Sequence, residues 1–303
     1  MTRRRDAVVP DRLGGASLAS ILAELFGLSA EASRQAIAEG AVFVGGKRQR
    51  DPASAVRAEA RLVLHELEPS AAPTPAARLV VLFEDESMIV LDKAPGEHLN
   101  ETETSAHPAI VEQLRPRIPG IRVVHRLDKE TSGVVVLAKD AAAAERLSAC
   151  FRERRAHKLY LAIAEGAPPE GPFEAAITED PKRPRARKVG RDGQAATTVF
   201  TVLGRAQGLS GVRAEPITGR THQIRVHLAH LGAPIVGDRL YAGPMAVRLG
   251  SLVLRVERTL LHAASLRLDL GRGATRSFAA PLPEDFGPFV RAGLLPSAMD
   301  SAL

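Results

Sequence analysis

The chain has 303 residues, of which 45% are hydrophobic and 25% are charged, a composition that excludes wholesale disorder. Its 41 Lys and Arg against 35 Asp and Glu give a formal net charge of +6, which favours a polyanionic partner. The single cysteine, Cys150, excludes an internal disulfide and a cysteine metal cluster. Because neither a leader-type apolar segment nor a stretch of membrane-spanning length is found, we predict a cytoplasmic protein that does not enter a membrane.

Residues 17–68 are predicted to form a small N-terminal module. Ser17 is a candidate cap for a first helix, "SLASILAELF", whose leucine and isoleucine residues recur at helical spacing. A second helix is predicted from Ser29 to Gly40, followed by a strand and a Gly-Gly turn in "AVFVGGKRQR" and by a returning strand, "ARLVLHEL". On pattern alone, this module could be a structural appendage or a binding unit.

Residues 68–78, "EPSAAPTPAAR", contain no large apolar side chain and are predicted to be an extended linker. A second domain is predicted over residues 79–290. Helical and strand patterns mingle there without the regular alternation that is typical of a parallel, doubly wound sheet. The predicted fold class is therefore α+β.

The stretch "HRLDKETSG" places one carboxylate, Asp128, between Arg126 and Lys129 and directly before the apolar run "VVVLA". The two cations favour the ionised form of the aspartate. An ionised carboxylate is a poor general acid but a competent base or nucleophile. A surface turn stabilised by ion pairs is the alternative interpretation.

The stretch "THQIRVHLAHLG" is predicted to be a short helix that is capped by Thr221 and ends at Gly232. His222 and Arg225 are three residues apart and share an edge, from which Arg225 could reach a carboxylate elsewhere. The three histidines of this helix do not have the spacing of the HExxH pattern and lack a cysteine partner. We therefore predict no metal site here.

Two further stretches are candidate binding elements. Tyr160, in the predicted strand "KLYLAIAEG", could stack on a planar ligand or could be an ordinary half-buried strand residue. In residues 182–191, six of ten residues are basic, and flanking prolines favour a loop. Such a loop suits phosphate binding but could also be merely solvated.

Together these motifs resemble the RluA-like family of RNA pseudouridine synthases. The resemblance lies in "HRLDKETSG", then "KLYLA", then "TGRTHQIRVHLAHLGAPIVGDRLY", and finally "LHAASLRL" with "FAAPLPEDF", in this order over much of the second domain. The N-terminal module resembles the S4-type RNA-binding module. These resemblances imply an S4-like module followed by a catalytic domain with a mixed, mainly antiparallel sheet and a central cleft.

The resemblance also implies a reaction and roles for individual residues. The reaction is a cofactor-free isomerisation in which the base of a uridine leaves C1′ through N1 and reattaches through C5. Asp128 would be the catalytic aspartate, acting at C1′ or on the C2′ proton, with Arg225 as its partner and Tyr160 stacked on the uracil. The implied substrate-binding residues are Arg126, in the gap left by the extruded nucleotide, Lys158, Thr131, His222, Lys182, Arg183, Arg185 and Arg187.

The RNA target and the oligomeric state are also expectations that follow from the resemblance. The N-terminal module favours ribosomal RNA over tRNA as the partner, and we expect a monomer without a metal. One departure from the family pattern is the turn at residues 93–96, Lys-Ala-Pro-Gly, which is followed by an acidic loop. The alternatives are an RNA-binding protein that keeps the fold without isomerising and a metal-dependent hydrolase.

Overall fold

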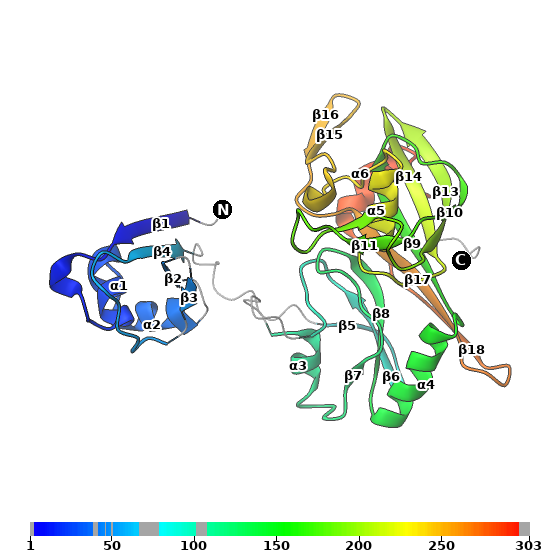
Figure 1. Cartoon of the computed structure of the whole chain (residues 1–303). Coiled ribbons are helices and arrows are strands. Elements are labelled where there is room, and N and C mark those ends of the chain that lie inside the picture. Colours follow the sequence, from blue (N-terminus) through cyan, green and yellow to red (C-terminus); the bar gives the residue numbers. More distant parts are fainter. Residues whose placement is uncertain are drawn as a thin grey trace. The chain divides into compact units, whose positions relative to one another are not determined.

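The computed structural model describes residues 3–38, 42–45, 47–49, 51–66, 79–100 and 108–296. These residues belong to two compact units, of which the first ends at residue 66 and the second begins at residue 79. Each unit is described by itself (Figure 1). No helix among the described residues is both long and apolar enough to cross a bilayer.

The first unit packs two helices on a four-stranded sheet with the strand order β1-β4-β2-β3. Ser17 caps the first helix, since its Oγ accepts a hydrogen bond from the Ser20 amide at 3.3 Å. Leu18, Ile21 and Leu22 are fully buried on one face of that helix. The elements are β1 (Arg3–Val8), the 3-10 turn η1 (Asp11–Leu13), α1 (Leu18–Phe26), α2 (Ala30–Ala38), β2 (Val42–Val44), β3 (Lys47–Gln49) and β4 (Arg61–Glu66).

The two helices, β2 and the returning strand β4 agree with the elements predicted from the sequence, whereas β3, which follows the Gly-Gly turn, was not predicted. Strand β1 was not anticipated. It pairs antiparallel with β4 and precedes residue 17. The unit therefore begins N-terminal to the predicted boundary at residue 17. The predicted linker at 68–78 and the second glycine of the Gly-Gly turn lie outside the described residues.

The second unit is built on a ten-stranded sheet whose main path is β10-β13-β14-β9-β17-β8-β6-β5, with β18 on β17 and β7 on β8. The predicted α+β composition and mixed sheet are confirmed, because the β17–β8 pair is parallel and the other described pairs are antiparallel. The strands are β5 (Val80–Glu84), β6 (Met88–Lys93), β7 (Arg122–Val123), β8 (Ser132–Ala138), β9 (Ala156–Glu165), β10 (Gly171–Glu174), β13 (Thr197–Ala206), β14 (Leu209–Pro216), β17 (Leu261–Asp269) and β18 (Thr275–Ala279).

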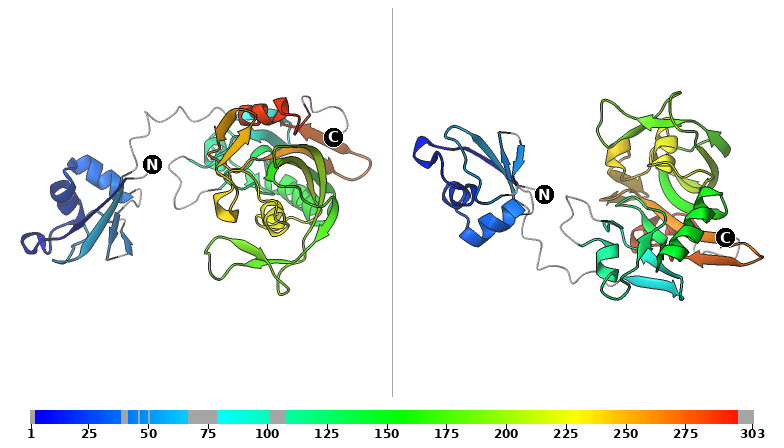
Figure 2. Two further views of the ribbon diagram at one scale, coloured as in Figure 1. Left: turned by 90° about the horizontal axis from the view of Figure 1, so that it is seen from above. Right: turned by 60° about the horizontal axis from the view of Figure 1, so that its bottom comes forward.

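Helices and two hairpins surround this sheet. The left view of Figure 2 looks along α5 and shows the green strands curving around it. The helical elements are α3 (Ile110–Leu114), α4 (Ala141–Arg152), α5 (Gln223–His230), α6 (Gly287–Arg291) and the 3-10 turns η2 (Arg239–Tyr241) and η3 (Glu284–Phe286). The hairpins are β11 (Ile177–Glu179) with β12 (Arg187–Val189) and β15 (Ala246–Leu249) with β16 (Leu252–Arg255).

Strands β6 and β8 carry apolar residues on both faces, which explains the uninterrupted run "VVVLA". Alternate side chains of a strand point to opposite faces. Ile89 and Val135 therefore join the larger hydrophobic cluster, whereas Val90 and Val136 join a second cluster that contains Leu147 of α4. Both faces are covered, so this part of the sheet is a rigid base for the loop that precedes β8.

The parallel contact between β8 and β17 depends on a glycine. Residues Ser132 and Gly133 pair with His262 and Ala263. Gly133 has φ of +109°, and a Cβ at this position would lie 2.2 Å from the carbonyl oxygen of Ala263. Only glycine can therefore stand where the chain leaves the Asp128 loop and enters the sheet.

We expect Gly133→Ala to lower the free energy of unfolding by roughly 3 kcal/mol or more, because backbone strain adds to a clash with backbone atoms. The measurement is urea-induced unfolding of the second unit. Gly208→Ala is the matched control: its φ is +79°, but nothing lies within 4 Å of a Cβ there, so it should cost about 1–2 kcal/mol. If both variants lose the same free energy of unfolding, the close approach of the Ala263 backbone is not what requires glycine at position 133.

Candidate active site

Asp128 lies in the loop between β7 and β8 and faces an open cavity of about 600 Å³. The loop turns back at this point, since the Thr131 amide donates a hydrogen bond to the Asp128 carbonyl oxygen at 3.1 Å. The cavity, called the Asp128 cavity below, is also lined by residues of β9, β17 and the segment before α5. Its other lining residues are Arg126, Leu127, Thr131, Lys158, Tyr160, Pro216, Thr218, Gly219, Arg220, Thr221, His222, Gln223, Ile224, Arg225 and Leu261.

Arg225 of α5 connects Asp128 to a second, fully buried carboxylate, Asp238. Its Nη1 donates to Asp128 Oδ2 at 2.9 Å, while Nε and Nη2 donate to the two oxygens of Asp238 at 2.7 and 2.9 Å. Burial disfavours the charged guanidinium, but the hydrogen bonds and charges of the two carboxylates outweigh it and raise the pKa of Arg225. The arginine therefore holds Asp128 in a fixed orientation, which is the pairing that the resemblance implied.

Asp238 was missed by the sequence analysis, although it lies in the quoted stretch "VGDRLY". Besides holding Arg225, its Oδ1 accepts from the Leu240 and Tyr241 amides at 3.1 and 3.2 Å and so caps η2. The side chain is 0% exposed. The available signal was a single acid one glycine after the apolar pair Ile235 and Val236, and such an acid needs a partner if it is buried.

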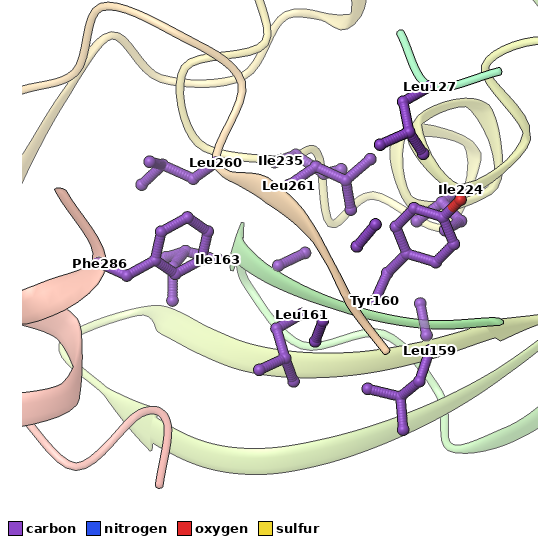
Figure 3. Close-up of a cluster of buried hydrophobic side chains, with 14 of the residues drawn as sticks. Leu127, Leu159, Tyr160, Leu161, Ile163, Ile224, Ile235, Leu260, Leu261 and Phe286 are labelled. Atoms are coloured by element: carbon purple, nitrogen blue, oxygen red, sulfur yellow. The ribbon is translucent and has the colours of Figure 1, made fainter. Parts of the chain in front are cut away.

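Tyr160 and Lys158 lie on the same face of β9, since they are two residues apart, and both line the cavity. Figure 3 shows the Tyr160 ring at the edge of the larger hydrophobic cluster, near Leu127 and Ile224. Burial, together with the negative charge of Asp128, raises the pKa of Tyr160, so its hydroxyl stays protonated. Burial lowers the pKa of Lys158 to about 8, so its amine still carries a charge at neutral pH.

His222 stands directly before α5 and does not share the helix edge predicted for it. Its φ of +57° is left-handed, and it occupies the N-cap position without a side-chain capping bond. The predicted cap at Thr221 is therefore wrong, because the left-handed residue resets the start of the helix. The ring is fixed by a hydrogen bond between Nδ1 and the Tyr241 hydroxyl at 2.8 Å, and Nε2 lies 3.9 Å from Asp128 Oδ1.

The remaining predicted residues separate into two groups. Arg126 is exposed and Thr131 is buried, and both line the Asp128 cavity. The four predicted basic residues at 182–187 do not line it. They lie in the β11–β12 hairpin, where Arg183 pairs with Asp180 at 2.8 Å and Arg187 with Glu179 at 3.1 Å.

The prediction of a loop at 182–191 is wrong for residues 187–189, which form β12. These residues pair with β11, and the stretch is thereby a hairpin with a basic tip. The hairpin also contacts the catalytic side of the unit, because the Arg187 amide donates to the Tyr241 hydroxyl at 2.8 Å. Lys182, Arg185 and Lys188 are exposed.

The Lys-Ala-Pro-Gly turn supports the Asp128 loop from behind. The buried Lys93 amine donates to the carbonyl oxygens of Ala94, Glu97 and Lys129 at 2.9, 3.1 and 3.0 Å. Three acceptors match its three donors. Burial lowers the pKa of Lys93 to about 8. The Gly96 amide adds a bond to the same Lys129 carbonyl at 2.8 Å, so the departure from the family pattern leaves the support intact.

Two histidines of the quoted motifs have structural contacts. Burial lowers the pKa of His125 to about 3, and its Nε2 accepts a hydrogen bond from the Val136 amide at 3.0 Å. His227 of α5 is 0% exposed and contacts Thr198 and the Ala175 carbonyl at 3.0 and 3.1 Å. Within the described ranges, no group of three or more His, Cys, Asp or Glu side chains is placed to hold a metal ion.

Comparison with known proteins identifies the family. Residues 87–230 match the family model described as RNA pseudouridylate synthase. A ribosomal large subunit pseudouridine synthase D of Xanthomonas campestris is 36% identical over 301 residues, which covers 93% of this chain and 90% of that protein. This chain belongs to the RNA pseudouridine synthase family. The resemblance seen in its motifs is thus confirmed.

Other members agree with this assignment. A Pseudomonas aeruginosa protein, also named ribosomal large subunit pseudouridine synthase D, is 35% identical and covers 93% of each chain. A dual-specificity RNA pseudouridine synthase RluA of Salmonella typhimurium is 38% identical over 63% of this chain and 86% of its own. The solved human structure titled RNA Pseudouridylate Synthase Domain Containing 4 has a TM-score of 0.58 at 27% identity, covering 70% of this chain and 92% of its own.

We expect Asp238→Asn to lower the free energy of unfolding by about 3 kcal/mol, because it leaves the buried Arg225 with an incomplete counter-charge. Urea unfolding with intrinsic tyrosine fluorescence is the measurement. Glu179→Gln, which breaks the exposed pair with Arg187, is the control and should cost less than about 1 kcal/mol. An Asp238→Asn protein as stable as the wild type would show that Asp238 does not anchor Arg225.

Proposed function

We propose that this enzyme converts uridine to pseudouridine in large-subunit ribosomal RNA, with Asp128 as the catalytic carboxylate. The observation that carries this proposal is the position of Asp128 in the cavity, with Oδ2 held by Arg225 and Oδ1 3.9 Å from His222 Nε2. The proposed target follows the names of the synthase D relatives. The alternatives are a tRNA substrate and RNA binding without isomerisation.

The reaction needs one permanently ionised carboxylate next to the ribose. The N1–C1′ bond breaks, the base turns, a C5–C1′ bond forms and the C5 proton moves to nitrogen, so substrate and product are isomers and no cofactor is consumed. Asp128 would either attack C1′ or remove the C2′ proton. The Arg225 contact supports this role because the charged guanidinium donates to Oδ2 and thereby holds the carboxylate in one orientation.

The set of acids in the cavity argues against hydrolysis. A glycosidase uses two carboxylates and a water molecule. Among the described residues that line the Asp128 cavity, Asp128 is the sole carboxylate. Asp238 lies behind Arg225 and is fully buried, so it cannot serve as a second acid at the sugar. The site therefore suits a reaction that retains the base.

Tyr160 is proposed as the platform on which the uracil stacks. Its ring is held between aliphatic residues at the cavity wall, so little conformational entropy is lost when a base binds to it. The raised pKa makes its hydroxyl a hydrogen-bond donor rather than a base at neutral pH. Uracil carbonyl oxygens are suitable acceptors for such a donor.

Cations around the cavity are proposed to bind and open the RNA. Lys158, charged at neutral pH, would contact a phosphate or the base next to Tyr160. Arg126, exposed at the rim, would fill the gap left when the target nucleotide is extruded from a structured RNA. The β11–β12 hairpin and the N-terminal unit, proposed to be an S4-like module, would add affinity through phosphate contacts.

Asp128→Asn tests the proposed chemistry. The substitution is nearly isosteric but removes the ionised oxygen, so we expect pseudouridine formation to fall at least about a thousandfold while RNA affinity falls no more than about tenfold. The measurement is single-turnover conversion of ribosomal RNA, with the modified position mapped by reverse transcription after carbodiimide treatment. A variant that retains turnover would remove Asp128 from the mechanism, and a wild-type enzyme that modifies only tRNA would replace the proposed target.

The basic hairpin should contribute affinity rather than chemistry. Neutralising Lys182 and Arg185 should lower the magnitude of the slope of log affinity against log salt by about 1.5. The reason is that two phosphate contacts are lost, and the counterions that these contacts displaced are no longer released on binding. Neutralising Arg183 and Arg187 is the matched control, and it should lower the slope less, since carboxylates already pair with these arginines. A slope that neither double variant changes would place the RNA elsewhere.

A further inference from the structure

His222 and Asp128 present a hydrogen-bond donor and an acceptor to the same space in the Asp128 cavity. The distance between His222 Nε2 and Asp128 Oδ1 is 3.9 Å, which is too long for a direct hydrogen bond. One oxygen atom placed between them can lie about 2.8 Å from each, which is an ordinary hydrogen-bond distance. Both residues line the cavity, so this position is open to a ligand.

The hydrogen-bond network behind His222 makes Nε2 the donor. The Tyr241 hydroxyl accepts a hydrogen bond from the Arg187 amide at 2.8 Å and lies 2.8 Å from His222 Nδ1. A hydroxyl has one proton to donate, and within the described part of the chain His222 Nδ1 is the acceptor found for it. A neutral imidazole whose Nδ1 accepts must carry its proton on Nε2. Burial, which lowers the pKa of His222, favours this neutral form.

The acceptor is equally well defined. Arg225 Nη1 donates to Asp128 Oδ2, and Nε and Nη2 of the same guanidinium donate to Asp238. Oδ1 is therefore the oxygen that faces His222. A group bound between Nε2 and Oδ1 must accept from the imidazole and donate to the carboxylate, and a hydroxyl does both.

In an internal nucleotide of an RNA chain, the 2′-hydroxyl is the only free hydroxyl of the ribose, because the 3′ and 5′ oxygens are esterified. We propose that His222 and Asp128 together bind the 2′-hydroxyl of the target nucleotide and thereby make the site specific for RNA over DNA. The 2′-hydroxyl is the group by which proteins distinguish the two. This inference rests on the proposed function, which brings the target ribose next to Asp128.

The backbone at His222 allows a sharp choice of variants. Its φ of +57° is a strained conformation for a residue other than glycine, and asparagine tolerates it better than most residues. An asparagine amide reaches only as far as Nδ1, whereas the amide of glutamine reaches about as far as Nε2. His222→Gln thus keeps a donor near the proposed hydroxyl, and His222→Asn keeps the backbone preference without that donor.

The experiment is a cycle of two substrates and four proteins. The probe is a ribosomal RNA fragment that contains the uridine converted by the wild-type enzyme, or, if none is converted, a uridine-bearing stem-loop. It is made with ribose or 2′-deoxyribose at that uridine. The proteins are wild type, His222→Asn, His222→Gln and, as a control on the exposed end of the same helix, His230→Asn. Affinity and single-turnover rate are measured for each pair.

For wild type and His230→Asn, we expect the 2′-deoxy substitution to reduce binding at least about tenfold, because it removes both hydrogen bonds that the 2′-hydroxyl makes, one with His222 and one with Asp128. His222→Asn should bind the ribose probe more weakly than wild type does, and the deoxy probe should cost it less than it costs wild type, because only the bond with Asp128 remains to be lost. His222→Gln should retain part of the discrimination. Effects of the deoxy sugar on the chemistry itself are common to all proteins and cancel in the cycle.

Two results would overturn the inference. In the first, the fold loss in affinity caused by His222→Asn and the fold loss caused by the deoxy probe multiply. This would show that His222 and the 2′-hydroxyl do not interact. In the second, His222→Asn discriminates between the ribose and deoxy probes as well as wild type does, while His222→Gln binds both probes more weakly. This would show that residue 222 matters only for the left-handed backbone conformation. Failure of the proposed function would appear differently, as an absence of pseudouridine from the wild-type reaction, while the affinity cycle would still report on the 2′-hydroxyl.

Discussion

The guanidinium of Arg225 is the interaction on which the rest of the site depends. It joins the loop before β8, through Asp128, to the turn after α5, through Asp238. Two carboxylates and one guanidinium in a largely buried position are costly to desolvate, and the geometry offsets this cost only because each bond is short and well directed. The arrangement leaves Asp238 shielded and Asp128 half open, so that two chemically identical side chains have different functions.

The sheet gives Asp128 its fixed position before any ligand binds. The loop enters β8 at Gly133, where the backbone of β17 approaches too closely for any side chain. Directly after Asp128, the loop is held by the Lys93 amine and the Gly96 amide, which both bind the Lys129 carbonyl. A charged amine that is buried among carbonyl oxygens is a rigid support, because breaking one bond would leave a donor of a buried charge without a partner. The segment that follows Asp128 is thus anchored at two points, Lys129 and Gly133.

The Tyr241 hydroxyl connects the hairpin proposed to bind RNA to His222 at the Asp128 cavity. It accepts a hydrogen bond from the Arg187 amide of β12 and is also hydrogen-bonded to His222 Nδ1. Because the amides of Leu240 and of Tyr241 itself donate to Asp238, the position of the Tyr241 ring depends on the same carboxylate that holds Arg225. The ring also lies under the Arg225 guanidinium, 5.1 Å from its carbon. The residues proposed for RNA affinity and those proposed for the chemistry therefore share one polar network.

The sequence by itself determined the elements with local causes. The helix after Ser17 and the apolar strand "VVVLA" follow from capping and periodicity, which depend only on near neighbours. The order of the motifs was enough to indicate the family. What only the tertiary structure decided are the contacts between distant residues: the pairing of Arg225 with Asp238, the three carbonyls around Lys93 and the strand formed by residues 187–189. The left-handed His222 belongs with these, because no local preference favours it and the bond to Tyr241 holds it. Such features are fixed by partners that the chain brings together only on folding, so periodicity and spacing carry no signal for them.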